Sequence, residues 1–138
     1  MKHGLMKHGS PGNRLFVYGT LMSGDQSGGL LRGLPILPAQ TRGRLYRMPA
    51  GYPVMVLDDD GPWVHGELVE LDGAGRLMLL DSFEGVGQGL YTREVIRVAY
   101  DGRSANCWAY VMTAAQVRSR KAARLKGNNW RRYRWGRS

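Results

Sequence analysis

Carboxylate side chains are the best candidates for chemistry in this sequence. It contains no phosphate-binding GxxxxGK[ST], zinc-protease HExxH or hydrolase GxSxG pattern. His65 is the only histidine after residue 13 and Cys107 is the only cysteine, so a Ser–His or Cys–His pair would have to use them. We interpret His65 as a strand-face residue and Cys107 as an inert buried thiol. A mechanism based on a single carboxylate remains.

Glu84 and Asp81 are the acidic residues whose spacing is most informative. Residues 72–84 have a helical pattern, and Glu84 follows Leu77 by seven positions and Leu80 by four. It therefore shares the apolar stripe of those leucines, and Asp81, four after Leu77, is its competitor. A carboxylate at the end of such a stripe lies either at a rim or on the floor of a pocket. Partial desolvation would raise its pKa and make it a usable general base.

A glycine turn at the end of the first strand is the second candidate site. It reads Tyr18-Gly19-Thr20-Leu21. A concave turn of this kind exposes backbone N–H groups that suit a carboxylate or an oxyanion. The alternative interpretation is an ordinary exit from a strand into a loop.

Strands dominate the framework that must position these groups. We expect strands at residues 14–18, 36–48, 52–57, 63–71, 91–100 and 104–111. The turns between them predict hairpins joining 52–57 to 63–71 and 91–100 to 104–111. Two helices interrupt the strands without regular alternation. The fold class is therefore α+β, with a small, mostly antiparallel or mixed β-barrel and flanking helices.

Capping residues set the expected limits of the two helices. Asp72 is a suitable N-cap for the first, which should end at Phe83 or Glu84 with Gly85 as its stop. Thr113 is a suitable N-cap for the second, which should run to about residue 126 and end at Gly127.

The length of 138 residues allows a single domain, and the charge is unevenly distributed along it. Residues 1–101 contain 10 Lys/Arg and 11 Asp/Glu, a net of −1, whereas residues 102–138 contain 10 Lys/Arg and no acid. We interpret 1–13 as a flexible leader or expression remnant, 14–126 as the domain and 127–138 as a basic aromatic tail. With no apolar span, no signal peptide and a single cysteine, we expect a cytoplasmic protein.

Short motifs follow one another along the chain at residues 16–21 (FVYGTL), 51–53 (GYP), 64–68 (VHGEL), 81–85 (DSFEG), 90–95 (LYTREV), 108–111 (WAYV) and 129–131 (NWR). Their order resembles the gamma-glutamylcyclotransferase-like family, in particular its gamma-glutamylamine cyclotransferase-like branch. Each motif is short, but the ordered set over residues 14–133 is specific. The sequence departs from the family pattern at Asn128-Asn129, where the family has Gly-Asp before the tryptophan.

The resemblance implies a small α+β barrel with one cavity and a set of site residues. It implies that Glu84 is the catalytic acid/base and that the glutamyl group is cradled by Tyr18, Gly19, Thr20 and Leu21. Tyr52 and Tyr91 line the cavity under this interpretation; the alternative for both is packing against the sheet. Arg93 either pairs with a substrate carboxylate or is an ordinary strand-surface arginine.

The activity implied is the release of 5-oxoproline and a free amine from a γ-glutamylamine or γ-glutamyl peptide. The α-amine of the substrate is the nucleophile, so one carboxylate can act as both base and acid, and no metal or organic cofactor is needed. Two alternatives remain: a non-catalytic small-molecule-binding or adaptor protein of the same fold, and nucleic-acid binding through the basic C-terminal segment. We expect a small-molecule partner, regard nucleic acid as a less favoured partner, and expect no membrane association; the sequence leaves the oligomeric state undetermined.

Overall fold

The structure is a computed structural model, and it describes residues 10–19, 31, 33–88, 91–125 and 127. Thr20 and Leu21 therefore lie outside the described residues, as do most of the expected leader and nearly all of the expected basic tail.

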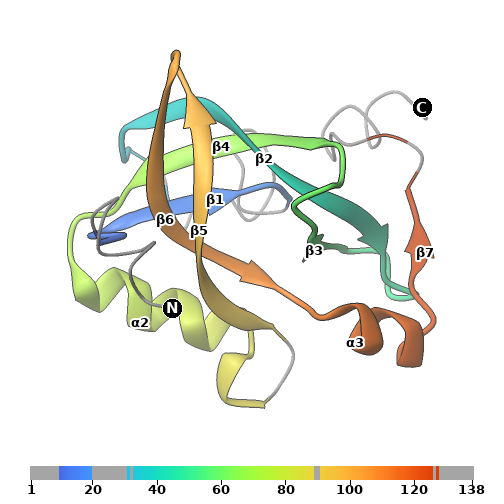
Figure 1. Cartoon of the computed structure of the whole chain (residues 1–138). Coiled ribbons are helices and arrows are strands. Elements are labelled where there is room, and N and C mark those ends of the chain that lie inside the picture. The colour runs from blue at the N-terminus through green and yellow to red at the C-terminus, as the bar shows by residue number, and fades with distance from the viewer. Residues whose placement is uncertain (1–9, 20–30, 32, 89–90, 126, 128–138) are drawn as a thin grey trace.

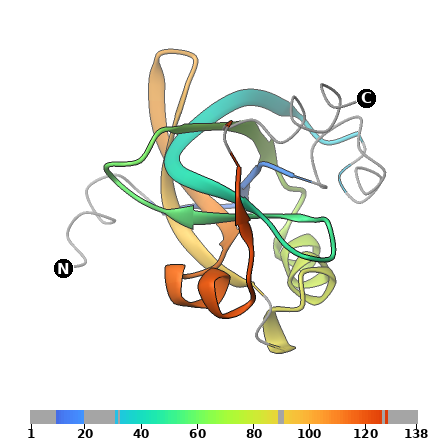
Figure 2. The ribbon, with the colours of Figure 1, turned by 90° about the vertical axis from the view of Figure 1, so that its right-hand side faces the viewer.

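Seven strands and two α-helices make up the described part of the chain (Figure 1). In order, the elements are β1 (Arg14–Val17), β2 (Ile36–Arg47), β3 (Pro53–Leu57), β4 (Trp63–Glu70), α2 (Ala74–Phe83), the 3-10 turn η2 (Val86–Gln88), β5 (Thr92–Tyr100), β6 (Arg103–Val111), α3 (Ala114–Ser119) and β7 (Ala123–Arg124). The two helices lie at the lower end of the sheet in both side views, and the tip of the β5–β6 hairpin lies at the upper end (Figures 1 and 2).

The strands β2, β4, β1, β6 and β5 close into a barrel within the described residues. β1 pairs antiparallel with β4 and parallel with β6, so the barrel is mixed. The ring closes where Gln40 of β2 pairs with Ala99 of β5, and Thr41 Oγ1 donates a hydrogen bond to the Arg97 carbonyl (2.8 Å) beside that pair. The predicted α+β barrel is confirmed.

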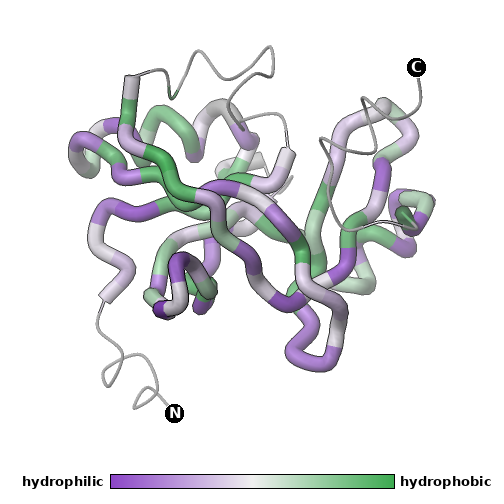
Figure 3. The backbone as a smooth tube through the Cα atoms, turned by 90° about the horizontal axis from the view of Figure 1, so that it is seen from above, coloured by the Kyte–Doolittle hydropathy of each residue, from purple (hydrophilic) through white to green (hydrophobic). Residues whose placement is uncertain are grey.

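Alternating burial along β2 and nearly continuous burial along β1 and β3 produce the core. Hydrophobic and hydrophilic segments are interspersed along the whole tube in Figure 3. The largest fully buried side chains include Phe16, Leu45, Met55 and Leu80. β1 and β4 approach so closely that a Cβ on Gly66 would lie 2.2 Å from the Val17 carbonyl oxygen.

The hairpin joining β5 and β6 is confirmed. Tyr100 pairs with Arg103, and the two residues between them, Asp101 and Gly102, both have positive φ (52° and 73°). That conformation suits the right-handed twist of the flanking strands. The Asp-Gly dipeptide was therefore a sufficient signal.

The other predicted hairpin is wrong. β3 pairs with the second half of β2, and β4 pairs with the first half of β2 and with β1. β2 is long enough to pair with both strands in succession. The Asp58–Gly61 segment is instead a turn in which Gly61 N–H donates to the Asp58 carbonyl (2.9 Å).

Helix limits differ from the prediction at two places. Asp72 is not the N-cap of α2: Gly73 holds that position without a side-chain cap, and Asp72 forms an ion pair with Arg76 (2.8 Å). Thr113 does cap α3, through a capping box with Gln116. That helix ends at Ser119 rather than near residue 126, because the chain reverses at Lys121 (φ 59°) and pairs with β2 as β7.

Candidate active site

A pocket gathers residues from five separate segments of the fold. Its cavity volume is about 30 Å³, and it is partly open to solvent. Its lining comes from the exit of β1, the start of β3, the end of α2, the residue before β5, and β6: Phe16, Val17, Tyr18, Gly19, Pro53, Glu84, Tyr91 and Tyr110. Three tyrosines surround one carboxylate in this arrangement.

Glu84 is placed in the pocket by the end of α2. It is the C-cap residue, and its N–H donates to the Leu80 carbonyl (2.9 Å). Gly85 follows with φ 68°, so the chain leaves the helix at the glycine that the sequence predicted as its stop. Leu77 and Leu80, on the same stripe, are buried. Of the two alternatives that the sequence left open, the structure places Glu84 among the residues lining the pocket.

The environment of Glu84 changes its acidity. Burial raises the pKa of its carboxyl from 4.5 to about 7. No ion pair with Glu84 occurs among the described residues. A carboxyl with this pKa exists in comparable amounts of both forms at neutral pH, so it can both accept and return a proton.

Asp81, the competing carboxylate, differs from Glu84 because it has an ion-pair partner, Arg93. Arg93 donates to it twice, from Nε at 2.7 Å and from a terminal guanidinium nitrogen at 3.1 Å. The Tyr110 hydroxyl donates to it as well, at 2.7 Å. Arg93 also lies over the ring of Trp108, 4.3 Å from its centroid. Arg93 is therefore paired within the protein.

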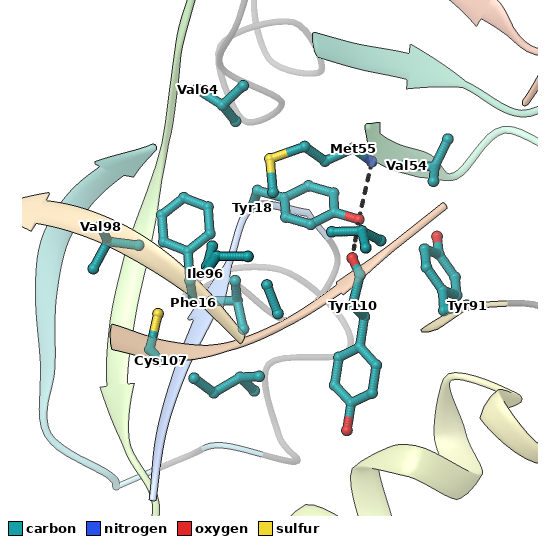
Figure 4. Packing of buried hydrophobic residues seen from close by; sticks show 14 of the residues in the cluster. Phe16, Tyr18, Val54, Met55, Val64, Tyr91, Ile96, Val98, Cys107 and Tyr110 are labelled. Atoms are coloured by element: carbon teal, nitrogen blue, oxygen red, sulfur yellow. Dashed lines mark hydrogen bonds between the residues drawn. The ribbon is translucent and has the colours of Figure 1, made fainter. Parts of the chain in front are cut away.

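Tyr18 joins three strands through its hydroxyl (Figure 4). The hydroxyl donates to the Tyr110 carbonyl (2.6 Å) and accepts a hydrogen bond from Met55 N–H (3.0 Å). Burial first, and then the charge of Glu84, raise the pKa of this hydroxyl well above its usual range. Tyr18 thus lines the pocket while its hydroxyl supports the backbone of β3 and β6.

Tyr91 and Tyr52 differ in their relation to the pocket. Tyr91 lines it and donates a hydrogen bond to the Pro53 carbonyl (2.5 Å). Burial is the main cause that raises the pKa of Tyr91 far above its usual range, with smaller contributions from Tyr18 and Glu84. Tyr52 packs beside Tyr91, with ring centroids 6.3 Å apart, and it is half-buried.

Gly19 is required by the close approach of Pro53. A Cβ on Gly19 would lie 2.3 Å from Cγ of Pro53.

The lining residues Pro53 and Tyr110 were not among the predicted site residues, although both lie within motifs quoted for the resemblance. The missing signal was spatial, since only the pairing of the strands brings these motifs to one place.

The remaining reactive side chains lie away from the pocket. His65 is exposed on β4. Cys107 is fully buried on β6, and burial raises the pKa of its thiol to about 12.

The described residues include no cluster of three or more His, Cys, Asp or Glu side chains arranged to hold a metal ion. None of the helices in the described part of the chain is long and apolar enough to span a membrane.

Comparisons with solved structures identify similar folds. The YkqA protein from Bacillus subtilis superimposes with a TM-score of 0.69 at 24% identity; 89% of this chain is covered, but only 41% of that protein. An AIG2-like protein from Mus musculus has a TM-score of 0.56 and 25% identity, covering 73% of this chain and 77% of that one. A structure described as a gamma-glutamyl cyclotransferase has a TM-score of 0.58 and 22% identity, covering 72% and 66%.

The sequence comparison assigns the family. A search of curated proteins gives no match. The pattern of the family described as "Gamma-glutamyl cyclotransferase, AIG2-like" matches residues 15–132, which include every described residue that lines the pocket. The chain therefore belongs to the AIG2-like gamma-glutamyl cyclotransferase family.

Proposed function

We propose that this protein is a γ-glutamyl cyclotransferase that releases 5-oxoproline and a free amine from a γ-glutamylamine or γ-glutamyl peptide. The observation that carries the proposal is Glu84: a carboxyl with a pKa of about 7, in a pocket lined by three tyrosines. Family membership supports cyclotransferase chemistry in general terms. The class of substrate and the roles of the residues are proposed from the resemblance of the motifs together with the pocket in which they meet.

The reaction needs one group that moves a proton. The α-amine of the substrate attacks its own side-chain carbonyl carbon, a C–N bond forms, and a five-membered ring closes. Glu84 takes a proton from the amine and gives it to the leaving nitrogen as the original amide C–N bond breaks. Because nucleophile and electrophile belong to one molecule, correct folding of the substrate supplies several kcal/mol of the barrier. For the neutral α-amine this single transfer through Glu84 closes the proton balance; the ammonium form first loses one proton to water.

The turn after β1 is the proposed cradle for the glutamyl group. The described part of that turn is Tyr18 and Gly19, and both line the pocket with Glu84. Thr20 and Leu21 are proposed to complete it. Backbone N–H donors in such a turn would stabilise the negative charge that develops on the carbonyl oxygen during ring closure. Tyr91 is proposed to line the substrate-binding cavity, with Tyr52 packed behind it.

The test is the release of 5-oxoproline from a panel of γ-glutamyl substrates. We expect Glu84→Gln to lower kcat by about 10²–10⁴-fold, the usual contribution of general acid–base catalysis. We expect kcat/KM of the wild-type protein to rise with pH and to level off above about pH 7, since the carboxylate form accepts the proton. A Glu84→Gln variant with wild-type turnover would refute the role of Glu84. Binding of γ-glutamyl substrates without any turnover would identify a binding protein instead.

A further inference from the structure

Each of the three tyrosines that line the pocket donates its hydroxyl proton in a hydrogen bond to another group of the protein. Carbonyl and carboxylate oxygens can only accept hydrogen bonds, so the hydroxyl must be the donor in each contact. Tyr18 donates to the Tyr110 carbonyl, Tyr91 donates to the Pro53 carbonyl, and Tyr110 donates to Asp81. The phenol oxygens can therefore offer only lone pairs to a ligand.

The Tyr110 hydroxyl has two acceptors within reach, the Asp81 carboxylate at 2.7 Å and the Leu77 carbonyl at 3.5 Å, and the shorter contact to Asp81 determines its orientation. Its partner Asp81 is held by two hydrogen bonds from Arg93, and a guanidinium group can only donate. Asp81 is therefore the acceptor in all three hydrogen bonds, and the hydroxyl proton of Tyr110 points toward it. Tyr110 and Glu84 line the same pocket. Burial and then Asp81 raise the pKa of the Tyr110 hydroxyl, with a smaller contribution from the charge of Glu84.

We propose that Tyr110 accepts a hydrogen bond from the primary amine of the ligand, and that Asp81 and Arg93 are positioning residues that fix its hydroxyl for this purpose. In a γ-glutamyl compound the amine must approach Glu84 before it can lose a proton. An oxygen that offers only lone pairs, in the same pocket as that carboxylate, selects a group with several N–H donors. This assignment rests on the proposed function for the identity of the ligand, but it predicts a binding preference that exists without turnover.

Two matched ligands measure that preference. γ-Glutamyl methylamide carries the α-amine, and glutaric acid monomethylamide is the same molecule without it. Their affinities are compared by calorimetry at pH 7 in the full chain carrying Glu84→Gln, where turnover is slow. The ratio of the two affinities does not depend on the fraction of folded protein, so a partly destabilised variant still gives an answer.

We expect the amine-bearing ligand to bind about tenfold or more tightly, because a hydrogen bond to a charged group contributes that much. Adding Tyr110→Phe should bring the ratio close to one by weakening the amine-bearing ligand only. Tyr100→Phe, which makes the same chemical change on β5 away from the pocket, should leave the ratio unchanged. Asp81→Ala removes the acceptor at 2.7 Å and leaves the Tyr110 hydroxyl only the long contact to the Leu77 carbonyl (3.5 Å) among the described groups, so it should reduce the preference although Tyr110 is still present.

The outcomes that overturn the proposal are distinct from failure of the proposed function. Equal affinities for the two ligands, no binding of either, or a preference that survives Tyr110→Phe would refute the role of Tyr110. A preference that survives Asp81→Ala would refute the positioning role of Asp81. If wild-type protein makes no 5-oxoproline but the preference depends on Tyr110, the proposed function fails and this assignment stands.

Discussion

Replacing Glu84 with glutamine should make the protein more stable at alkaline pH while it removes the proposed catalytic group. Burial raises the pKa of Glu84 from 4.5 to about 7, so its anion is disfavoured in the folded state. Since a shift of one pKa unit corresponds to about 1.36 kcal/mol, ionised Glu84 destabilises the folded state by roughly 3 kcal/mol. Glutamine has a similar volume and no charge, so it avoids this penalty.

The sign of the pH dependence follows from the two protonation states. Below pH 4.5 the Glu84 carboxyl is protonated in both the folded and the unfolded chain, so Glu84 causes no loss of stability there. Between pH 4.5 and about 7 the unfolded chain ionises first, so the free energy of unfolding falls; above about pH 7 the loss is complete. We expect Glu84→Gln to match the wild type within about 1 kcal/mol at pH 5 and to exceed it by roughly 3 kcal/mol at pH 8.

Urea unfolding at the two pH values measures this difference, and Asp81→Asn is the matched control on the same helix. Asp81 accepts three hydrogen bonds from Arg93 and Tyr110, so its conversion to an amide should destabilise the protein by about 1–3 kcal/mol. The two carboxylate-to-amide substitutions should thus have opposite signs at pH 8. A Glu84→Gln variant that loses stability at pH 8, or that has the wild-type pH dependence, would refute the desolvation of Glu84.

Two further substitutions test the frame of the pocket. Tyr18→Phe removes a hydroxyl that bonds two buried backbone groups, and we expect a loss of about 2–3 kcal/mol in urea unfolding; an unchanged midpoint would show that the hydroxyl bonds do not support the fold. Gly19→Ala places a Cβ 2.3 Å from Cγ of Pro53, so it should cost about 1–3 kcal/mol and weaken ligand binding. In Gly75→Ala the new Cβ meets nothing within 4 Å on α2, so it should stabilise the protein by about 1 kcal/mol; equal effects of the two glycine substitutions would contradict the packing argument.

Local signals in the sequence were reliable where one segment determines the result. The positive-φ turn at Asp101-Gly102, the Thr113 cap and the Gly85 stop each depend on residues that are neighbours in the chain. The barrel was predictable from the ordered motifs. The strand partners were not, because β2 is long enough to pair with two strands in succession.

Contacts between motifs were the part of the site that the sequence did not reveal. Asp81 and Arg93 belong to different motifs, and periodicity on the helix does not indicate which strand lies against its end. The same applies to Tyr110, which the sequence placed only in a closing strand. For α3 the sequence predicted too long a helix. The residues after Ser119 have helical propensity, but the pairing of β7 with β2 overrides it.

The position of the pocket follows from an incomplete junction in the sheet. In the described residues β3 pairs along its length with β2, and Met112 N–H, in the residue after β6, donates a hydrogen bond to the Met55 carbonyl (3.1 Å). A regular ladder would leave no space there. The Tyr18 and Tyr91 hydroxyls instead bond to backbone groups of β3, so those buried groups are satisfied while the two strands stay apart. The aromatic rings that make these bonds then become the walls around Glu84.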